Sequence, residues 1–301
     1  MPPIERTASR KSEVRSSKSS SYDVRFTFYF WLKSYPAKLP SMQRRRQLPV
    51  ALTIAGSDSG GGAGIQADLK TFAALGVHGT TAITCITAQN PRAVLGIQAC
   101  RPLMVSRQLE AVFESFRPAA AKTGMLYSTA IIRAVAEFLR PRRVPLVVDP
   151  VMVSTSGAQL LQPAAIRFLK KDLLPLATLV TPNLPEAELL LGRGIRSGED
   201  MRAAARELHR RFACAALVKG GHLRGQKVAV DVFYDGKREL LLSAPFIRGV
   251  RTHGSGCTYA AAVTAFLARG LPLARAISQG KEYITHAIAL RRYAGREMVL
   301  G

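Results

Sequence analysis

A run of glycines after an apolar segment is the first feature of this sequence that could bind a ligand. Five glycines fall within residues 56–64, between the apolar segment Val50–Ala55 and a helical pattern over Ile65–Leu75. In a strand, loop and helix of this kind, backbone N–H groups and the helix N-terminus face an anion or a small polar ligand. The spacing matches neither the P-loop nor the Gly-x-Gly-x-x-Gly pattern. A tight turn alone needs fewer glycines, so we interpret residues 56–64 as a ligand-binding loop.

A second glycine-containing loop, Thr252-His-Gly-Ser-Gly-Cys-Thr258, precedes an apolar helical segment near the C-terminus. Gly254 and Gly256 allow the backbone N–H groups to turn toward one point, with the positive end of the helix dipole behind them. Such an anion hole suits the charge that spreads over a phosphoryl group during its transfer. Cys257 lies where a helix N-terminus lowers the pKa of a thiol, although a small buried residue is the alternative interpretation. We therefore expect an acidic, reactive thiol at Cys257.

Polar residues also follow several other apolar segments. These residues are Gln89-Asn90, Thr123-Gly124-Met125, Asp149-Pro150-Val151-Met152, Thr181-Pro182-Asn183-Leu184-Pro185-Glu186 and Lys219-Gly220-Gly221-His222. For each group alone, a structural role as a turn residue or helix cap is a better explanation than a functional role. Together they indicate a site, because ligands of open α/β sheets bind outside the carboxyl ends of the strands.

The elements that would position these residues alternate along the chain. Apolar segments that read as buried strands are Val50–Ala55, Thr80–Thr87, Ala119–Thr123, Val144–Asp149, Thr178–Thr181 and Cys214–Lys219. Helical patterns cover Ile65–Leu75, Ser106–Phe116, Thr129–Leu139, Ala164–Leu173, Glu186–Leu191, Gly198–Phe212, Gly256–Ala268 and Leu273–Arg292. This alternation predicts an α/β fold with a mostly parallel sheet that is covered on both faces. Within residues 228–243, an Asp-Gly turn between two apolar segments predicts a small β-hairpin.

The composition argues against several classes of protein. Of the 301 residues, 48% are hydrophobic, and no apolar stretch approaches the ~20 residues of a membrane span. The formal net charge of +23 suits anionic ligands such as nucleotides, and no nucleic-acid motif accompanies it. The four cysteines form no CxxC pair, which argues against a zinc site or a disulfide scaffold and favours a reducing compartment.

Residues 1–46 differ in composition from the remainder. They are Ser-rich, and their eleven basic residues against three acidic ones give a charge of +8. An organellar transit peptide fits this composition, whereas a secretory signal fits poorly because no small-residue cleavage site stands out. We favour Met42 as the true start over the transit peptide. In each case we expect residues 1–46 to be a disordered leader and residues 47–301 to form the folded domain.

The motifs resemble those of the hydroxymethylpyrimidine/phosphomethylpyrimidine kinases of thiamine biosynthesis, which belong to the ribokinase-like superfamily. The segments that carry the resemblance are Gly56–Asp68, Ala88–Asn90, Asp149–Met152, Thr181–Glu186, Val218–His222 and Thr252–Thr258. They occur in the family's order from about residue 50 to about residue 290. The resemblance implies a three-layer α/β/α kinase. It would use Mg-ATP to phosphorylate 4-amino-5-hydroxymethyl-2-methylpyrimidine, and then convert the monophosphate to the diphosphate.

The resemblance also implies roles for individual residues. The expected pyrimidine pocket comprises Gly56, Asp68, Gln89, Met125 and Val151. Asn183 and Glu186 would organise magnesium and phosphates, with Asp149 nearby, and Lys219 and Thr252 would meet the ATP phosphates. The expected anion hole and reaction centre comprise Gly254, Ser255, Gly256 and Cys257. Cys257 stands where most of the superfamily has an aspartate base, so a thiolate could accept the proton of the substrate alcohol.

Two departures and three alternatives accompany the resemblance. The family's glycine-rich tail is missing after Gly295, and Ser57 and Ser255 stand where the family often has threonine. A pyridoxal kinase is the nearest alternative, and Gln89-Asn90 argues for the aminopyrimidine instead. A non-catalytic nucleotide-binding regulator and a nucleic-acid-binding protein are the others. We expect a cytoplasmic homodimer whose partners are the pyrimidine and ATP, without nucleic acid or membrane; an organelle is the alternative location.

Overall fold

The computed structural model of the chain describes residues 47–154, 157, 159–221, 228–247, 253–290, 292–295 and 297–300. The expected leader, residues 1–46, lies outside the described residues, so the boundary between leader and folded domain stays a prediction. The residues from Leu48 onward form one unit by themselves. None of the helices in the described ranges is both long enough and apolar enough to cross a bilayer.

The apolar segments of the sequence pair into one central sheet. Its strands are β1 (Val50–Asp58), β2 (His78–Asn90), β3 (Ala93–Ala99), β4 (Ala120–Thr123), β5 (Leu146–Val148), β6 (Leu179–Val180), β7 (Ala215–Lys219), β8 (Val228–Tyr234) and β9 (Glu239–Pro245). Among the described residues the strand order is β3-β2-β1-β4-β5-β6-β7-β8-β9. Strands β2, β1, β4, β5, β6 and β7 run in parallel, whereas β3, β8 and β9 pair antiparallel to their neighbours. The sheet is thus mostly parallel, as expected.

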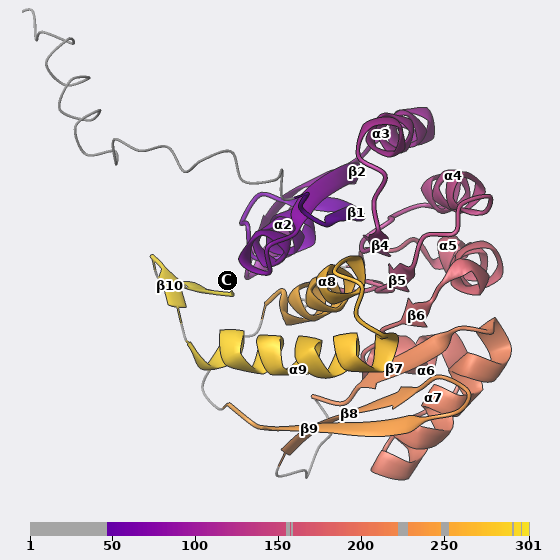
Figure 1. Ribbon diagram of the computed structural model, residues 1–301, viewed down its shortest axis with the longest axis vertical. Helices are drawn as coiled ribbons and strands as arrows, with labels where there is room; N and C mark the ends of the chain where they lie inside the picture. Colours follow the sequence, from indigo (N-terminus) through magenta and orange to yellow (C-terminus); the bar gives the residue numbers. More distant parts are fainter. Residues whose placement is uncertain are drawn as a thin grey trace, which may run out of the picture. The chain divides into compact units, whose positions relative to one another are not determined.

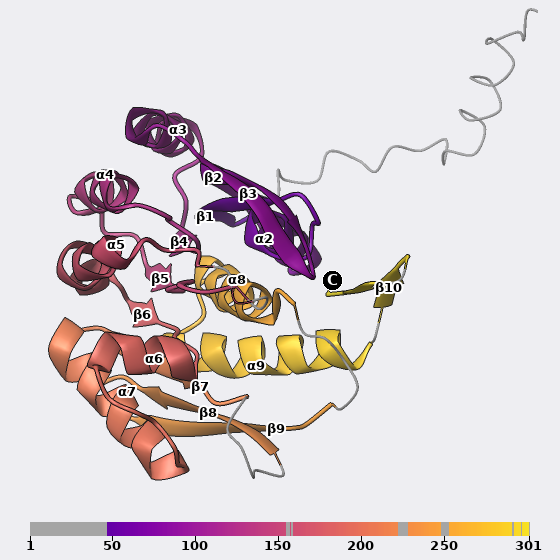
Figure 2. The ribbon, with the colours of Figure 1, turned by 180° about the vertical axis from the view of Figure 1, so that it is seen from behind.

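Helices cover both faces of this sheet, as Figures 1 and 2 show from opposite sides. One face carries α3 (Pro102–Ser115), α4 (Thr129–Leu139), α5 (Pro163–Phe168), α6 (Leu184–Leu191) and α7 (Gly198–Phe212). The other face carries α2 (Gly64–Ala74), α8 (Ser255–Ala268) and α9 (Leu273–Ala289). A separate apolar core lies on each side of the sheet. The three-layer α/β/α architecture is therefore confirmed.

Helix α8 lies between α2 and α9 and is buried along most of its length. Its sequence after Cys257 is rich in alanine, which allows the helix to approach the sheet closely. The other helices have a clearer polar face; in α7, for example, Ser197 and Asp200 form a capping box before an amphipathic stretch. The buried position of α8 fixes the loop at its N-terminus relative to the strands.

The strand register brings the carboxyl ends of the parallel strands to one edge of the sheet. Val50 of β1 pairs with His78 of β2, and Ala51 of β1 pairs with Ala120 of β4. Because all these strands run in the same direction, the loops that follow them meet at this edge. Of the polar residues singled out in the sequence, Gln89, Asn90 and Lys219 lie at the carboxyl ends of β2 and β7, and Asp149 and Asn183 lie on the loops after β5 and β6.

Apart from shifts of a few residues in the bounds of several elements, the structure differs from the sequence-based expectation in three places. Strand β3 was not predicted, because its residues are mostly exposed and its pairing with β2 forms the edge of the sheet. The final helix ends at Ala289, and a small hairpin of β10 (Arg292–Ala294) and β11 (Glu297–Val299) follows, where the helix was predicted to reach Arg292. The expected helix over Ala164–Leu173 changes after Phe168 into a π-helical turn. The hairpin of β8 and β9 is confirmed, with Gly236 of the turn at φ 93°.

Candidate active site

A pocket of about 310 Å³ runs along the carboxyl edge of the sheet. Ten of the expected site residues line it: Gln89, Val151, Asp149, Asn183, Glu186, Lys219, Gly254, Ser255, Gly256 and Cys257. Following the strand order, the pocket extends from the end of β2, past β5, β6 and β7, to β8 and β9. Its far end is largely apolar and is formed by Ala229, Ala244, Ile284 and Ile288. One continuous cavity therefore joins the two glycine-containing loops to an apolar recess.

The loop at the start of α8 requires glycine for two reasons. Gly254 is the N-cap of α8 with φ 78°, a left-handed conformation that residues other than glycine rarely adopt. A Cβ atom at Gly254 would lie 1.8 Å from the backbone oxygen of Gly62. At Gly256, a Cβ atom would lie 3.2 Å from Nζ of Lys219. The first N–H groups of α8 thus face the pocket beside a buried lysine, which is an arrangement that binds anions.

Cys257 lies in the first turn of α8, and part of its surface opens into the pocket. Burial raises the pKa of its thiol to about 11; the charges of Asp68 and Asp149 also raise it, while Lys122 and a hydrogen bond from the backbone N–H of Gly64 lower it. The expectation of an acidic thiol is therefore wrong. Cys257 lies at a helix N-terminus as expected. However, removal of water from around the sulfur raises the pKa of the thiol by more than the helix N-terminus lowers it. In the free protein the thiol is protonated at neutral pH.

Polar residues from the ends of β5, β6 and β7 meet beside Cys257. The Nζ atom of Lys219 lies 2.9 Å from Oδ1 of Asp149, which also accepts a hydrogen bond from the hydroxyl of Thr181. Burial alone would lower the pKa of Lys219, but the charges of Asp149 and Glu186 raise it above its ordinary value. Lys219 is therefore a fixed positive charge in the wall of the pocket.

Glu186 is held by the local structure of α6. Its Oε2 accepts the backbone N–H of Asn183 at 2.9 Å, while the Asn183 side chain accepts the backbone N–H of Glu186, so the two residues form a capping box. Burial raises the pKa of Glu186 to about 7, against the lowering effect of Lys219. The carboxylates of Glu186 and Asp149 are oxygen ligands of the type that Mg²⁺ prefers, and Mg²⁺ commonly binds one or two carboxylates together with substrate phosphates. The residues present thus fit this ion.

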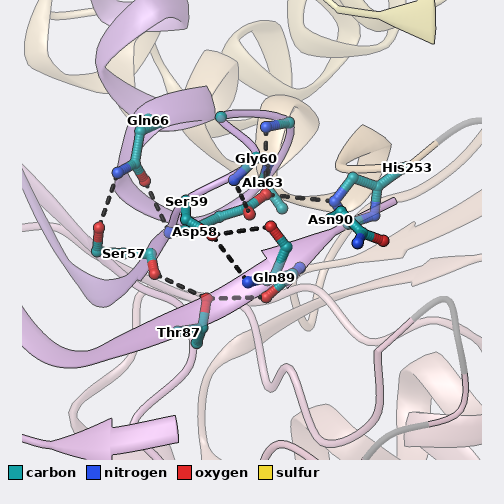
Figure 3. A network of polar contacts seen from close by, with 12 residues as sticks. Ser57, Asp58, Ser59, Gly60, Ala63, Gln66, Thr87, Gln89, Asn90 and His253 are labelled. Atoms are coloured by element: carbon teal, nitrogen blue, oxygen red, sulfur yellow. Dashed lines mark hydrogen bonds and ion pairs between the residues drawn. The ribbon is translucent and has the colours of Figure 1, made fainter. Parts of the chain in front are cut away.

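The other end of the pocket is shaped by Gln89 and an apolar floor. The hydroxyl of Thr87 donates to Oε1 of Gln89 at 3.1 Å, and Ser59 bonds to both the backbone N–H and the backbone oxygen of Gln89 (Figure 3). This leaves the Gln89 side-chain N–H₂ group as the donor for a ligand. Behind it lies a small apolar cluster built around Cys85, Met125 and Leu160.

The backbone at Val151 and Gly56 helps to shape the end of the pocket near Gln89. Val151 has φ 42°, which is a strained conformation for a β-branched residue. Strain of this kind is commonly retained where it positions a functional residue, and Val151 lines the pocket. A Cβ atom at Gly56 would lie 2.7 Å from Sγ of Cys85. Gly56 therefore allows the floor to pack tightly without itself lining the pocket.

Three expected site residues are placed differently from the rest, and a fourth lies outside the described residues. Gly56 and Met125 lie behind the floor of the pocket. Asp68 has no exposed surface, because its carboxylate accepts hydrogen bonds from Lys122 and from the hydroxyl of Thr53. Its expected contact with substrate stays a prediction. Thr252 lies outside the described residues, as does His222.

Sequence reasoning missed three residues that the structure brings to the site. Lys122 lies in the middle of a buried strand, where a lysine signals a buried partner. Asp58, at the end of β1, accepts hydrogen bonds from the N–H groups of the glycine loop, and His253 contacts Asp58 from the other loop. An acidic residue directly before a run of glycines was the available signal for Asp58.

Comparison with known proteins agrees with this geometry. A family model described as phosphomethylpyrimidine kinase matches residues 58–299. The thiamine biosynthesis bifunctional protein ThiED of Geobacter sulfurreducens is 51% identical over 246 residues, which are 81% of this chain but only 50% of that protein. The chain therefore spans about half the length of that relative.

Two solved structures are also similar. The phosphomethylpyrimidine kinase (thiD) of Clostridium difficile 630 has a TM-score of 0.71 and 43% identity, covering 80% of this chain and 100% of that one. An ADP complex of Bacillus subtilis pyridoxal kinase has a TM-score of 0.77 and 38% identity, covering 84% of this chain and 97% of that one. Family, fold and site geometry agree: the chain belongs to the phosphomethylpyrimidine kinase family.

Proposed function

We propose that this protein is an ATP-dependent kinase that phosphorylates 4-amino-5-hydroxymethyl-2-methylpyrimidine, and then its monophosphate to the diphosphate, in thiamine biosynthesis. One observation carries the proposal. A single pocket contains both the amide of Gln89 and the start of α8, and Lys219 lies in its wall. An alcohol bound beside Gln89 is thereby brought next to a phosphate bound at the start of α8.

The acceptor end suits a small aromatic ring with a polar edge. Val151 and Leu160 supply apolar contacts, and Gln89 supplies a side-chain N–H₂ donor whose orientation Thr87 fixes. An aminopyrimidine has ring nitrogens that accept such a hydrogen bond. The apolar recess at the opposite end, beside Ile284 and Ile288, suits the base of a nucleotide.

The centre of the pocket suits phosphoryl transfer. This reaction depends mainly on alignment and on neutralising the charge of the phosphoryl oxygens. The N–H groups at the start of α8 and the Lys219 ammonium group supply positive charge from two sides. Mg²⁺ bound by Asp149 and Glu186 would supply further positive charge to the phosphates.

Cys257 does not act as a general base that is deprotonated before the reaction begins. Because its pKa is about 11, its thiol carries its own proton before the reaction begins. A loose transition state for phosphoryl transfer places little demand on early proton removal. We assign the thiol to packing against the reacting alcohol. Because the thiol already carries a proton, it does not accept the proton of the alcohol, which leaves late in the reaction to a phosphoryl oxygen or to water.

A coupled assay of ADP formation tests the proposed function directly. The purified protein is supplied with Mg-ATP and either the hydroxymethylpyrimidine or pyridoxal, and kcat/KM is compared. We expect the pyrimidine to be preferred. The structural similarity to a pyridoxal kinase makes pyridoxal kinase the second candidate, and a preference for pyridoxal would establish it. The homodimer, the cytoplasmic location and the organellar alternative stay predictions.

A further inference from the structure

Asp58 connects the glycine loop to the loop that begins α8. Its Oδ1 accepts the backbone N–H of Gly60 at 2.8 Å, and its Oδ2 accepts that of Ala63 at 2.8 Å. The same Oδ2 lies 3.3 Å from Nε2 of His253, which is 195 residues away in the sequence. Figure 3 shows this carboxylate between the glycine loop and the imidazole. The side chain is almost fully buried, so these contacts are protected from water.

The two loops are also in direct contact through their backbones. A Cβ atom at Gly254 would lie 1.8 Å from the Gly62 oxygen, and a Cβ atom at Gly62 would lie 2.8 Å from Cδ2 of His253. The absence of side chains at both glycines allows this approach. The Asp58–His253 contact therefore closes an interface between the two loops.

The same interface continues to the acceptor end of the pocket. Ser59, the residue after Asp58, donates its hydroxyl to the Gln89 oxygen at 2.8 Å and accepts the Gln89 backbone N–H at 2.8 Å. On the other side, Oδ2 of Asp58 contacts Nε2 of His253, the residue before the N-cap of α8. Polar contacts thus run from Gln89 through the glycine loop to the loop that begins α8.

The imidazole has few other constraints. Its Nδ1 atom is buried and has no hydrogen-bond partner within the described ranges. Buried polar atoms normally have a hydrogen-bond partner. If the imidazole only filled space, we would expect Nδ1 to have such a partner as well. The contact between Nε2 and Asp58 is what orients the ring among the described residues, and it lies at the wall of the pocket.

We propose that Asp58 and His253 are positioning residues, which hold the glycine loop and the start of α8 in one register. The alcohol bound beside Gln89 is thereby kept in line with the N–H groups that receive the phosphoryl group. Neither residue needs to touch the reacting atoms for this. The proposal rests on the site assignment given under the proposed function. Misplacement of reacting groups by about 1 Å can lower a rate by about 100-fold, so such a contact is of catalytic consequence.

The test replaces each partner and measures chemistry separately from binding. In His253→Ala, we expect kcat for the hydroxymethylpyrimidine to fall by about 100-fold. The dissociation constants of ATP and of the pyrimidine should change by less than about threefold, because the residue acts on alignment and not on ground-state binding. His253→Gln, whose amide can still donate to Asp58, should recover much of the rate. His78→Ala, an exposed imidazole outside the pocket, is the control and should keep the wild-type kcat.

A double-mutant cycle tests whether the two residues act as a pair. If they do, Asp58→Asn combined with His253→Ala should be no slower than the slower single variant. Additive losses, or a wild-type kcat in His253→Ala, would overturn the proposal. A lower melting temperature with unchanged kcat for the folded fraction would also overturn it, because the contact would then be structural only.

A measurement that does not depend on enzyme activity tests the positioning role of Asp58 and His253 even if the protein catalyses a different reaction. Amide hydrogen exchange of Gly60–Ala63 is followed in the free protein and in His253→Ala. Faster exchange confined to this loop supports the connection between the loops, and unchanged exchange overturns it. A wild-type protein that phosphorylates neither the pyrimidine nor pyridoxal would instead contradict the proposed function. The two failures are therefore distinguishable.

Discussion

The ammonium group of Lys122 lies 2.7 Å from Oδ1 and 2.8 Å from Oδ2 of Asp68, and neither side chain has any exposed surface. The pair joins β4 to α2 directly beneath the reaction centre, and both charges act on the Cys257 thiol. Breaking one partner of a buried ion pair leaves an uncompensated charge in the interior. The pair therefore connects the stability of the fold to the electrostatics of the site.

Replacing Lys122 tests this connection. We expect Lys122→Met to lower the free energy of unfolding by about 3–5 kcal/mol, because Asp68 remains buried without its partner. Urea unfolding followed by circular dichroism measures the loss. Lys171→Met, at an exposed lysine of the π-helical turn, is the control and should change the free energy by less than about 0.5 kcal/mol. Equal effects of the two substitutions would show that the buried pair does not stabilise the fold.

Gly254→Ala should nearly abolish activity. The new Cβ atom would lie 1.8 Å from the Gly62 oxygen, so the two loops would have to separate. We expect kcat to fall by more than about 100-fold. Gly270→Ala is a matched control, because Gly270 has φ 84° and a Cβ atom there would meet no other atom within 4 Å. Both variants carry the strain of a left-handed alanine, and only the first should lose activity.

The pKa of Cys257 predicts its reactivity. A thiol with a pKa near 11 is almost wholly protonated at pH 8, so its alkylation by iodoacetamide should be roughly 100-fold slower than that of an ordinary thiol of pKa about 8.5. The rate should rise with pH up to pH 10, because the thiolate fraction increases as the pH approaches the raised pKa. Mass spectrometry of the labelled protein, with Cys257→Ala to identify the adduct, measures this. A rate that levels off near pH 7 would mean that the helix N-terminus outweighs burial after all.

We expect Gln89 to make the protein bind the hydroxymethylpyrimidine more tightly than pyridoxal. Gln89→Met removes the side-chain donor, and we expect it to weaken binding of the hydroxymethylpyrimidine by about 1–3 kcal/mol. Pyridoxal, which lacks the aminopyrimidine edge, should lose less. Steady-state KM values for both alcohols give the comparison. Equal losses would remove Gln89 from substrate recognition.

The strained backbone of Val151 predicts that a glycine variant at this position is more stable than an alanine variant. Glycine at this position would relieve the strain of φ 42°, whereas alanine would keep it. We therefore expect Val151→Gly to be more stable than Val151→Ala by about 1 kcal/mol. Thermal unfolding measures this difference. In both variants KM for the pyrimidine should rise, because an apolar wall of the pocket is lost.

Features carried by short stretches of sequence were predictable. Helix α7 has the bounds that its pattern predicted, since Ser197 and Asp200 mark its start and its apolar positions repeat at helical spacing. The hairpin of β8 and β9 followed from its Asp-Gly turn. Gln89, Asp149, Asn183 and Lys219 were found because each lies at or just after the end of a buried strand, and the parallel register brings those ends together. Gly254 and Cys257 were found because a glycine-containing loop precedes a helical pattern.

Features that depend on distant partners were not predictable. Lys122 and Asp68 are 54 residues apart, so their pairing follows from the packing of α2 on the sheet and not from local sequence. The position of Cys257 at the start of a helix was predicted correctly, but the pKa of its thiol depends on how much water the surrounding chain removes. Strand β3 exists because β2 offers it a partner, and its own residues give a weak signal.

The buried position of α8 has a consequence for how the enzyme loses activity on heating. Many binding loops open locally at free energies far below that of global unfolding. The anion-binding N–H groups here belong to a helix whose body is enclosed by α2, α9 and the sheet. This helix cannot fray without exposing apolar surface of the core. Thermal inactivation should therefore coincide with cooperative unfolding of the domain, with no range of temperature in which the protein is folded but inactive.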